Sequence, residues 1–434
     1  MRITPLVLTL MIGSALTACG NQALANTTGA AATGAPPGQA LNVSSDQVIA
    51  RDQARLRQNP SDWKSVDELA GAYLQKVREV GDPSYYPKVD ALLGSALRHD
   101  PADTEAATLM GTLTLARHQF MDALSWGNKA HALNPYASRP LGVISDAQTQ
   151  LGRYDEAVAS LQQMVNLRPD LSSYSRVSYL RELYGDVPGA IEAMKMAIAA
   201  GGPVPENLAY TEVLLGTVHF NNGHLKMAEA EYQQALHDFP GYVQATAGVA
   251  SVRAAQRRYP EAIRLYQRAI DIYPIPQYVI ALGDVYAVSG NRKTAGETYD
   301  LAAAEQSLYT ANGVDLDQEL ALFNADHHRN LDEALAAVRR AMRDRPNVIT
   351  ADSLAWTLYE TGDYTGALEA SQQAHRLGTL DALFFFHTGM IEMKLGMNVE
   401  AKADITKALA INPYFSVLYE RQARQTLASL GNHA

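Results

Sequence analysis

Nine alanines recur along this chain at a nearly constant spacing, and that period limits the folds open to it. The steps between them are 34, 33, 38, 34, 33, 39, 33 and 34 residues, and eight of the nine have a second alanine seven residues later. They are Ala123, Ala157, Ala190, Ala228, Ala262, Ala295, Ala334, Ala367 and Ala401. A period of this length means that each unit is one supersecondary element, which must stack on its neighbours to bury its apolar face. The sequence therefore predicts a solenoid.

Each unit carries the same helical pattern around its first alanine. A small residue lies upstream, a large apolar residue follows four positions later, and a proline often follows twelve positions later, as with Gly216, Ala228, Tyr232 and Pro240. Small residues let two helices approach closely, and proline ends a helix because it lacks an N–H. The pattern resembles the tetratricopeptide repeat family over about residues 62–413. The resemblance implies an all-α, right-handed superhelical solenoid of about ten helix-turn-helix repeats with a C-terminal capping helix.

The two longer steps indicate insertions, near residues 201–206 and 306–317. Insertions in repeat arrays map to loops, so we expect local changes in the superhelix there and room for binding loops.

The N-terminus has the form of an export signal. One arginine is followed by an apolar run and then by small residues ending in Leu16-Thr17-Ala18, directly before Cys19. This resembles the bacterial lipobox, and the resemblance implies a diacylglycerol-linked cysteine as the first residue of the mature protein. Gly20 follows, not the aspartate that retains such proteins at the inner membrane, which implies the periplasmic face of the outer membrane.

An alternative cleavage site lies after Ala25, because Ala23-Leu24-Ala25 has the small-x-small form. Cleavage there would remove Cys19, the single cysteine of the chain, and release a soluble periplasmic or secreted protein. With the lipobox, the chain divides into a signal peptide (1–18), the lipidated cysteine with a flexible tether rich in Ala, Gly, Pro and Thr (19–60), the repeat solenoid (61–413), and a capping helix and tail (414–434). Within the tether range, residues 46–57 could add a short polar helix.

Composition and motifs argue against nucleic acid and against catalysis. The net charge is −10, whereas phosphate binding needs a basic stripe. No H-E-x-x-H, G-x-S-x-G, glycine-rich phosphate loop or Cys-x-x-Cys occurs, so we expect neither an enzyme nor a cofactor. Ser61 and Lys64 match the bare S-x-x-K form, but its partner motifs are missing, and Ser61 is better interpreted as a helix cap. His327 and His328 are adjacent, so on a helix they would point about 100° apart and cannot easily share one metal ion.

The resemblance also implies a partner-binding groove. In tetratricopeptide repeats the first helix of each unit lines the concave face, and its fifth, ninth and twelfth positions point inward. In the last three units these positions are Glu319, Phe323 and Asp326, then Asp352, Trp356 and Tyr359, then Phe386, Met390 and Met393. Aromatic, methionine and acidic side chains would suit a partner with apolar and basic residues. The alternative is that they form core, covered by the closing helix around residues 415–430 or by tight curling of the last units.

These features predict a non-enzymatic scaffold that binds a protein or peptide partner in the bacterial cell envelope and is tethered there by its N-terminal lipid. The lysine and asparagine residues with which chaperone cofactors of the family clamp a terminal carboxylate are absent from the groove positions. The second hypothesis is a soluble exported protein that binds a glycan or small ligand, since Trp356 and Tyr359 could stack on sugars.

Overall fold

The computed structural model describes residues 44–201 and 204–431, and within these ranges it contains helices and no strand. The α-helices are α1 (Ser45–Gln58), α2 (Trp63–Val80), α3 (Tyr86–His99), α4 (Thr104–Ala116), α5 (Phe120–Leu133), α6 (Ser138–Gln150), α7 (Tyr154–Leu167), α8 (Leu171–Leu183), α9 (Val187–Ala200), α10 (Pro205–Asn221), α11 (Leu225–Asp238), α12 (Val243–Ala255), α13 (Tyr259–Ile272), α14 (Pro276–Val288), α15 (Arg292–Ala311), α16 (Asp317–Asp326), α17 (Leu331–Asp344), α18 (Val348–Thr361), α19 (Tyr364–Ala374), α20 (Ala382–Lys394), α21 (Asn398–Ile411) and α22 (Glu420–Gly431). Two short 3-10 helices, Pro83–Tyr85 and His375–Leu377, accompany them.

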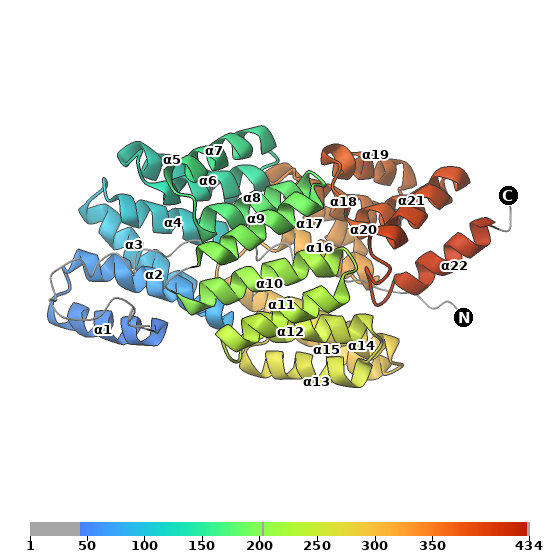
Figure 1. Ribbon diagram of the computed structural model, residues 1–434, viewed down its shortest axis with the longest axis horizontal. Helices are drawn as coiled ribbons and strands as arrows, with labels where there is room; N and C mark the ends of the chain where they lie inside the picture. Colours follow the sequence, from blue (N-terminus) through green and yellow to red (C-terminus); the bar gives the residue numbers. More distant parts are fainter. Residues whose placement is uncertain (1–43, 202–203, 432–434) are drawn as a thin grey trace.

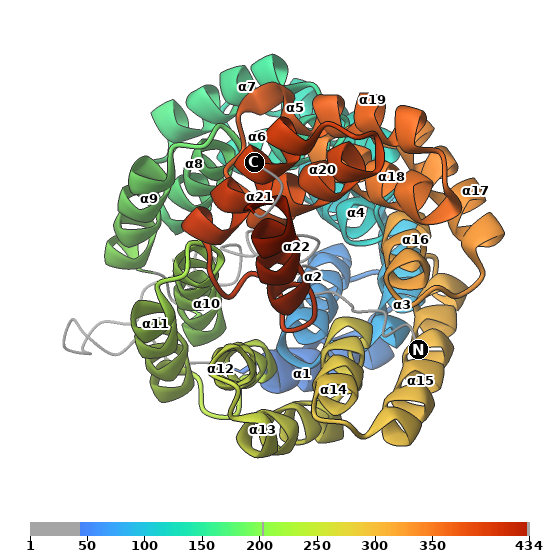
Figure 2. The ribbon, with the colours of Figure 1, turned by 90° about the vertical axis from the view of Figure 1, so that its right-hand side faces the viewer.

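From α2 onward, consecutive helices pack in ten pairs, from α2 with α3 to α20 with α21 (Figure 1). From α4 to α19 the even-numbered helix of each pair lies on the inside of the ring and the odd-numbered helix on the outside (Figure 2). In that view the chain runs counterclockwise from α5 to α19 while it approaches the viewer, which is a right-handed superhelix. The predicted all-α solenoid of about ten repeats is confirmed.

Glycines in the inner helices make room for large side chains of the outer helices. Tyr232 of α11 is fully buried between Gly216 of α10 and Gly248 of α12. A Cβ atom at Gly216 would lie 2.6 Å from the ring, and one at Gly248 would lie 2.7 Å from it. Such distances leave no space for an alanine, so the small and large positions of the sequence pattern are complementary packing partners.

Successive turns of the superhelix are in direct contact along what we call the seam. There, the ends of α6 and α8 meet the starts of α18 and α20, six pairs later, and the end of α10 meets the residues that follow α21. Across the seam Asn347 Nδ2 donates to the carbonyl of Gln150 (3.0 Å), Thr379 Oγ1 to that of Leu183 (2.5 Å) and Asn412 Nδ2 to that of Phe220 (3.0 Å). These bonds satisfy carbonyls at helix ends that have no partner within their own helix.

Two glycines of the seam sit in left-handed turns that allow the contact. Gly152 has φ +69° and Gly185 has φ +73°. A Cβ at Gly152 would lie 2.5 Å from the carbonyl oxygen of Pro346, and one at Gly185 would lie 2.5 Å from that of Gly378. Glycine is needed at these positions both for the backbone conformation and for the close approach of the next turn.

The two ends of the solenoid carry extra helices. The short helix expected from residues 46–57 is present as α1, so part of the predicted tether range is helical. The predicted cap of α2 is wrong in one detail: the side chain of Asp62, not that of Ser61, accepts the hydrogen bond from the first turn. At the other end α22 is the predicted capping helix, and it crosses the middle of the ring in Figure 2. The predicted signal peptide and Cys19 lie outside the described residues.

Candidate functional site

The residues predicted to line a C-terminal groove are for the most part covered. Trp356, Phe386, Met390, Asp326, Asp352 and Phe323 are 5% exposed or less, and Tyr359, Met393 and Glu319 are partly exposed. What covers several of them is residues 413–431, which we call the closing segment. Its Phe415, Leu418, Tyr419 and Ala423 are buried in one apolar cluster with Trp356, Phe386 and Met390. The alternative interpretation, in which the closing helix covers the stripe, therefore describes the geometry.

Trp356 of α18 is the centre of this cluster. Its indole stacks on Tyr359 and on His387, with ring centroids 4.7 and 4.2 Å apart. Tyr419 of the closing segment approaches it edge-on at 5.4 Å and stacks on Phe386 at 4.8 Å. Inner helices α18 and α20 thus form an aromatic surface, and the chain's own C-terminal residues occupy it.

Asp326 of α16 connects the closing segment to this surface. Trp356 Nε1 donates to Asp326 Oδ1 at 2.8 Å, and the hydroxyl of Tyr419 donates to the same oxygen at 3.0 Å. Burial raises the pKa of Asp326 well above its usual range, more than the hydrogen bond from Tyr419 lowers it. The other carboxylate oxygen is buried and accepts no hydrogen bond from the described residues. A buried polar atom of this kind favours a hydrogen-bonding group from whatever segment occupies the surface.

Asp352 pairs with a histidine beside the same cluster. Nδ1 of His387 lies 3.0 Å from both carboxylate oxygens of Asp352, and both side chains are almost completely buried. The pair fixes the ring of His387 against the face of Trp356. Asp352 is therefore occupied within the protein, and its predicted role as a contact for a basic partner stays a prediction.

Two of the predicted residues lie apart from the aromatic surface. Phe323 packs against Tyr299 and His327, with centroids 6.0 and 4.4 Å apart. Glu319 belongs to the seam: Arg345 donates to it at 2.9 Å, and Nδ1 of His118, one turn earlier, lies 3.7 Å away. Burial opposes ionisation, but Arg345 and then His118 outweigh it and hold the pKa of Glu319 below its usual value.

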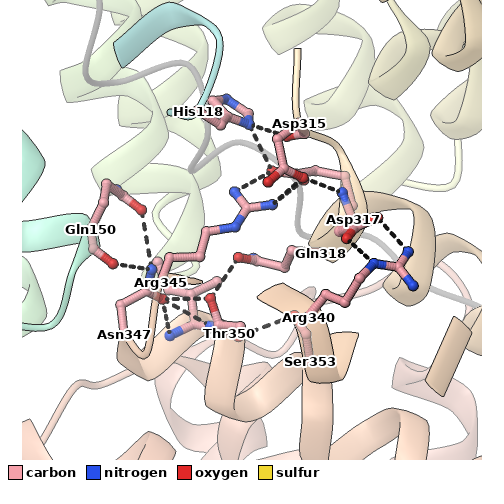
Figure 3. Close-up of polar contacts among 12 residues, drawn as sticks. His118, Gln150, Asp315, Asp317, Gln318, Arg340, Arg345, Asn347, Thr350 and Ser353 are labelled. Carbon is pink, nitrogen blue, oxygen red and sulfur yellow. Dashed lines mark hydrogen bonds and ion pairs between the residues drawn. The ribbon is translucent and has the colours of Figure 1, made fainter. Parts of the chain in front are cut away.

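The seam around Glu319 is a continuous polar network (Figure 3). His118 bonds through Nδ1 to the carbonyl oxygen of Asp315 at 2.8 Å, and burial lowers its pKa. Asn347 bonds to Gln150 and also caps α18 by accepting hydrogen bonds from two backbone N–H groups. The alanine pattern does not predict these seam residues. The turn between the two helices of a pair has glycine in several units but histidine at position 118, and this departure is a sequence signal for a contact there.

Neither a metal site nor a membrane span is found among the residues that the structure describes. No group of three or more His, Cys, Asp or Glu side chains there is placed to hold an ion. No helix in the described ranges is long and apolar enough to cross a membrane. His327 instead bonds to Asp284 of α14 at 3.2 Å.

The chain is similar to known proteins through its repeats. Tetratricopeptide repeat family models match residues 213–274 and residues 139–171. Superkiller complex protein 3 of Mus musculus is 35% identical over 78 residues, which are 18% of this chain, and the chain spans 5% of the length of that protein.

Three solved structures are similar to this chain at low sequence identity. They are the APC/C hetero-tetramer Cut9-Hcn1 (TM-score 0.49, 17% identity, 89% of this chain and 73% of that one), the human IFIT1 dimer with PPP-AAAA (0.45, 15%, 85% and 95%), and a tetratricopeptide repeat protein from Parabacteroides merdae (0.36, 18%, 60% and 99%). The family models thus match two stretches of the chain, which both lie within the array of ten consecutive helix pairs.

Proposed function

We propose that this protein is a non-enzymatic scaffold whose inner surface at α16, α18 and α20 binds a peptide or protein segment in the bacterial cell envelope. The observation that carries the proposal is the closing segment itself. Phe415, Leu418 and Tyr419 lie in an apolar and hydrogen-bonded site, so this surface accommodates a peptide chain. These three residues lie in the turn that precedes α22.

The closing segment indicates the chemistry of the partner. The site takes large apolar side chains against Trp356 and Phe386, and it takes a hydroxyl donor on Asp326. The second oxygen of Asp326 would form a further hydrogen bond with a polar group of the partner, such as a hydroxyl. A partner must compete with the closing segment, which is held at high effective concentration because it belongs to the same chain.

Peptide exchange tests this part of the proposal. A fluorescent peptide of residues 413–431 is titrated into the wild type and into a variant with Leu418→Asp and Tyr419→Asp, which should release the closing segment. We expect the peptide to bind the released variant at least tenfold more tightly than the wild type. Tyr414→Asp is the matched control, because Tyr414 is 39% exposed and belongs to the same segment. A released variant of native helicity that binds no peptide would contradict the proposal.

Membrane tethering is the second part of the proposal, and it rests on the sequence alone. The lipobox-like residues before Cys19, together with the polar Ala-, Gly- and Thr-rich stretch after it, support lipidation and a flexible spacer on the periplasmic face of the outer membrane. The intact mass of the mature protein tests it: the wild type should carry the mass of a lipid and Cys19→Ser should not. Recovery of the wild type in a soluble fraction with an unmodified N-terminus would favour the soluble binding protein instead.

A further inference from the structure

A cavity of about 170 Å³ lies inside the first turn, away from the closing segment, where the seam begins. Inner helices α2, α4, α10, α12, α14 and α16 all contribute to its wall. Aliphatic side chains and four tyrosines, at positions 86, 210, 278 and 309, form most of the lining. A cavity of about 150 Å³ holds benzene in a protein core. This one therefore has room for one six-membered ring with small substituents.

Part of this wall comes from the insertion that the alanine spacing had indicated. Gln306, Tyr309, Val314 and Leu316 line the cavity and fall in the extra residues of the 39-residue step. The hydroxyl of Tyr309 donates to the carbonyl of Gly81 at 2.5 Å, which fixes the insertion against α2. The insertion thus supplies one side of the cavity wall.

The charged groups at the wall are paired within the protein. Arg78 lies 3.6 Å from Glu206, which also accepts hydrogen bonds from Gln75 and Tyr242 at 2.7 Å. At the other side of the cavity, Glu319 is paired with Arg345 as described above. A charged ligand would have to lose its hydration without gaining an unpaired counter-charge, so the cavity favours a neutral molecule.

Hydrogen-bond acceptors without partners are present in the same wall. Gln244, Gln277 and Gln306 line the cavity from α12, α14 and α15. Gln244 donates through Nε2 to the carbonyl of Arg78 at 2.8 Å, but its Oε1 accepts no hydrogen bond from the described residues. Gln306 is only 2% exposed, and its Oε1 likewise accepts no hydrogen bond from the described residues. Buried acceptors are satisfied in most proteins, so a ligand with hydroxyl donors would complete this wall.

We propose that the cavity binds a small neutral molecule made of one six-membered ring with hydroxyl groups. Phenolic compounds and monosaccharides share this chemistry, and the aliphatic lining favours the phenolic type. The proposal goes beyond peptide binding and does not depend on it, because no closing-segment residue lines the cavity.

Calorimetric titration of the purified full chain with phenol, glucose and benzene tests the proposal. We expect saturable phenol binding, and Gln306→Leu should weaken it roughly tenfold, the effect of losing about one hydrogen bond. Leu316→Trp should abolish binding, because a larger side chain at this partly exposed position fills the cavity. Gln234→Leu, an exposed glutamine on α11, is the control and should bind like the wild type.

The outcomes separate the sources of the ring. Saturable binding of glucose but not of phenol would assign the site to sugars, and the proposal of a hydroxylated six-membered ring as ligand would stand. Benzene binding as tight as phenol would overturn recognition of the hydroxyl group. Failure of both phenol and glucose to saturate the wild type, or equal binding by Leu316→Trp at native helicity, would overturn the site itself.

Discussion

Replacement of Gly152 by alanine is the sharpest test of the seam. The φ of +69° costs an alanine about 1–2 kcal/mol, because its Cβ crowds the backbone in this conformation. In addition the new Cβ would lie 2.5 Å from the carbonyl oxygen of Pro346 in the next turn. The turns must then separate, which strains the hydrogen bonds of Asn347 to Gln150, worth about 1 kcal/mol each. We expect a total loss of about 2–4 kcal/mol.

Gly362→Ala is the matched control for this experiment. Gly362 has φ +91° at the equivalent turn of a later pair, but a Cβ there meets nothing within 4 Å. It should therefore lose only the conformational part, about 1–2 kcal/mol. Repeat arrays can unfold in parts, so urea unfolding should be followed together with hydrogen exchange at α6 and α18, which the seam joins. Equal losses in both variants, with unchanged exchange at the two helices, would refute the seam as a stabilising contact.

Two further predictions concern buried groups. Phe386→Ala should lose about 3–5 kcal/mol in urea unfolding because Phe386 is fully buried, whereas Phe385→Ala, one residue earlier and partly exposed, should lose half of that or less. A loss for Phe386→Ala as small as that for Phe385→Ala would mean that Phe386 is an exposed groove residue. For Glu212, burial and then the charge of Asp238 raise the pKa to about 8. The folded state holds this proton more tightly than the unfolded state does, so Glu212 contributes stability below about pH 4.5 that is lost as the pH rises to about 8. Glu212→Gln should reduce the decline in unfolding free energy over that range, and an unchanged decline would contradict the shift.

The fold could be predicted from the sequence because its information is local and repeated. Each unit packs its two helices in the same way, with a small residue of one helix against a large side chain of the other, as Gly216 and Tyr232 do. Nine copies in register leave little freedom in how the helices pair. The seam could not be predicted in this way, because the approach of Asn347 to Gln150 depends on small rotations added over six pairs.

The candidate site was predicted only in part, for a different physical reason. The spacing of inner-face positions brought Trp356, Phe386 and Asp326 to one surface as expected, because the helical period fixes which side chains share a face. The same period gives no information on which other segment of the chain covers that surface. Phe415 and Tyr419 follow the last repeat, outside the alanine pattern, and their apolar side chains are compatible with both a solvating cap and a covering segment.

The spacing along the seam indicates that helix pairs, not residues, set the superhelical turn. Gly152 faces Pro346, 194 residues later, and Gly185 faces Gly378, 193 residues later, but Gly223 faces Pro413 only 190 residues later. The last interval is the one that excludes the extra residues of the 38-residue step near Gly201. In each of the three cases one superhelical turn contains six helix pairs. The extra residues near Gly201 therefore lengthen the chain within a turn without changing the number of helix pairs that form it. The insertion at residues 306–317 differs, because it contacts the end of α2 across the seam and lines the cavity. Of the two interruptions in the period, the second is therefore the one with a function to test.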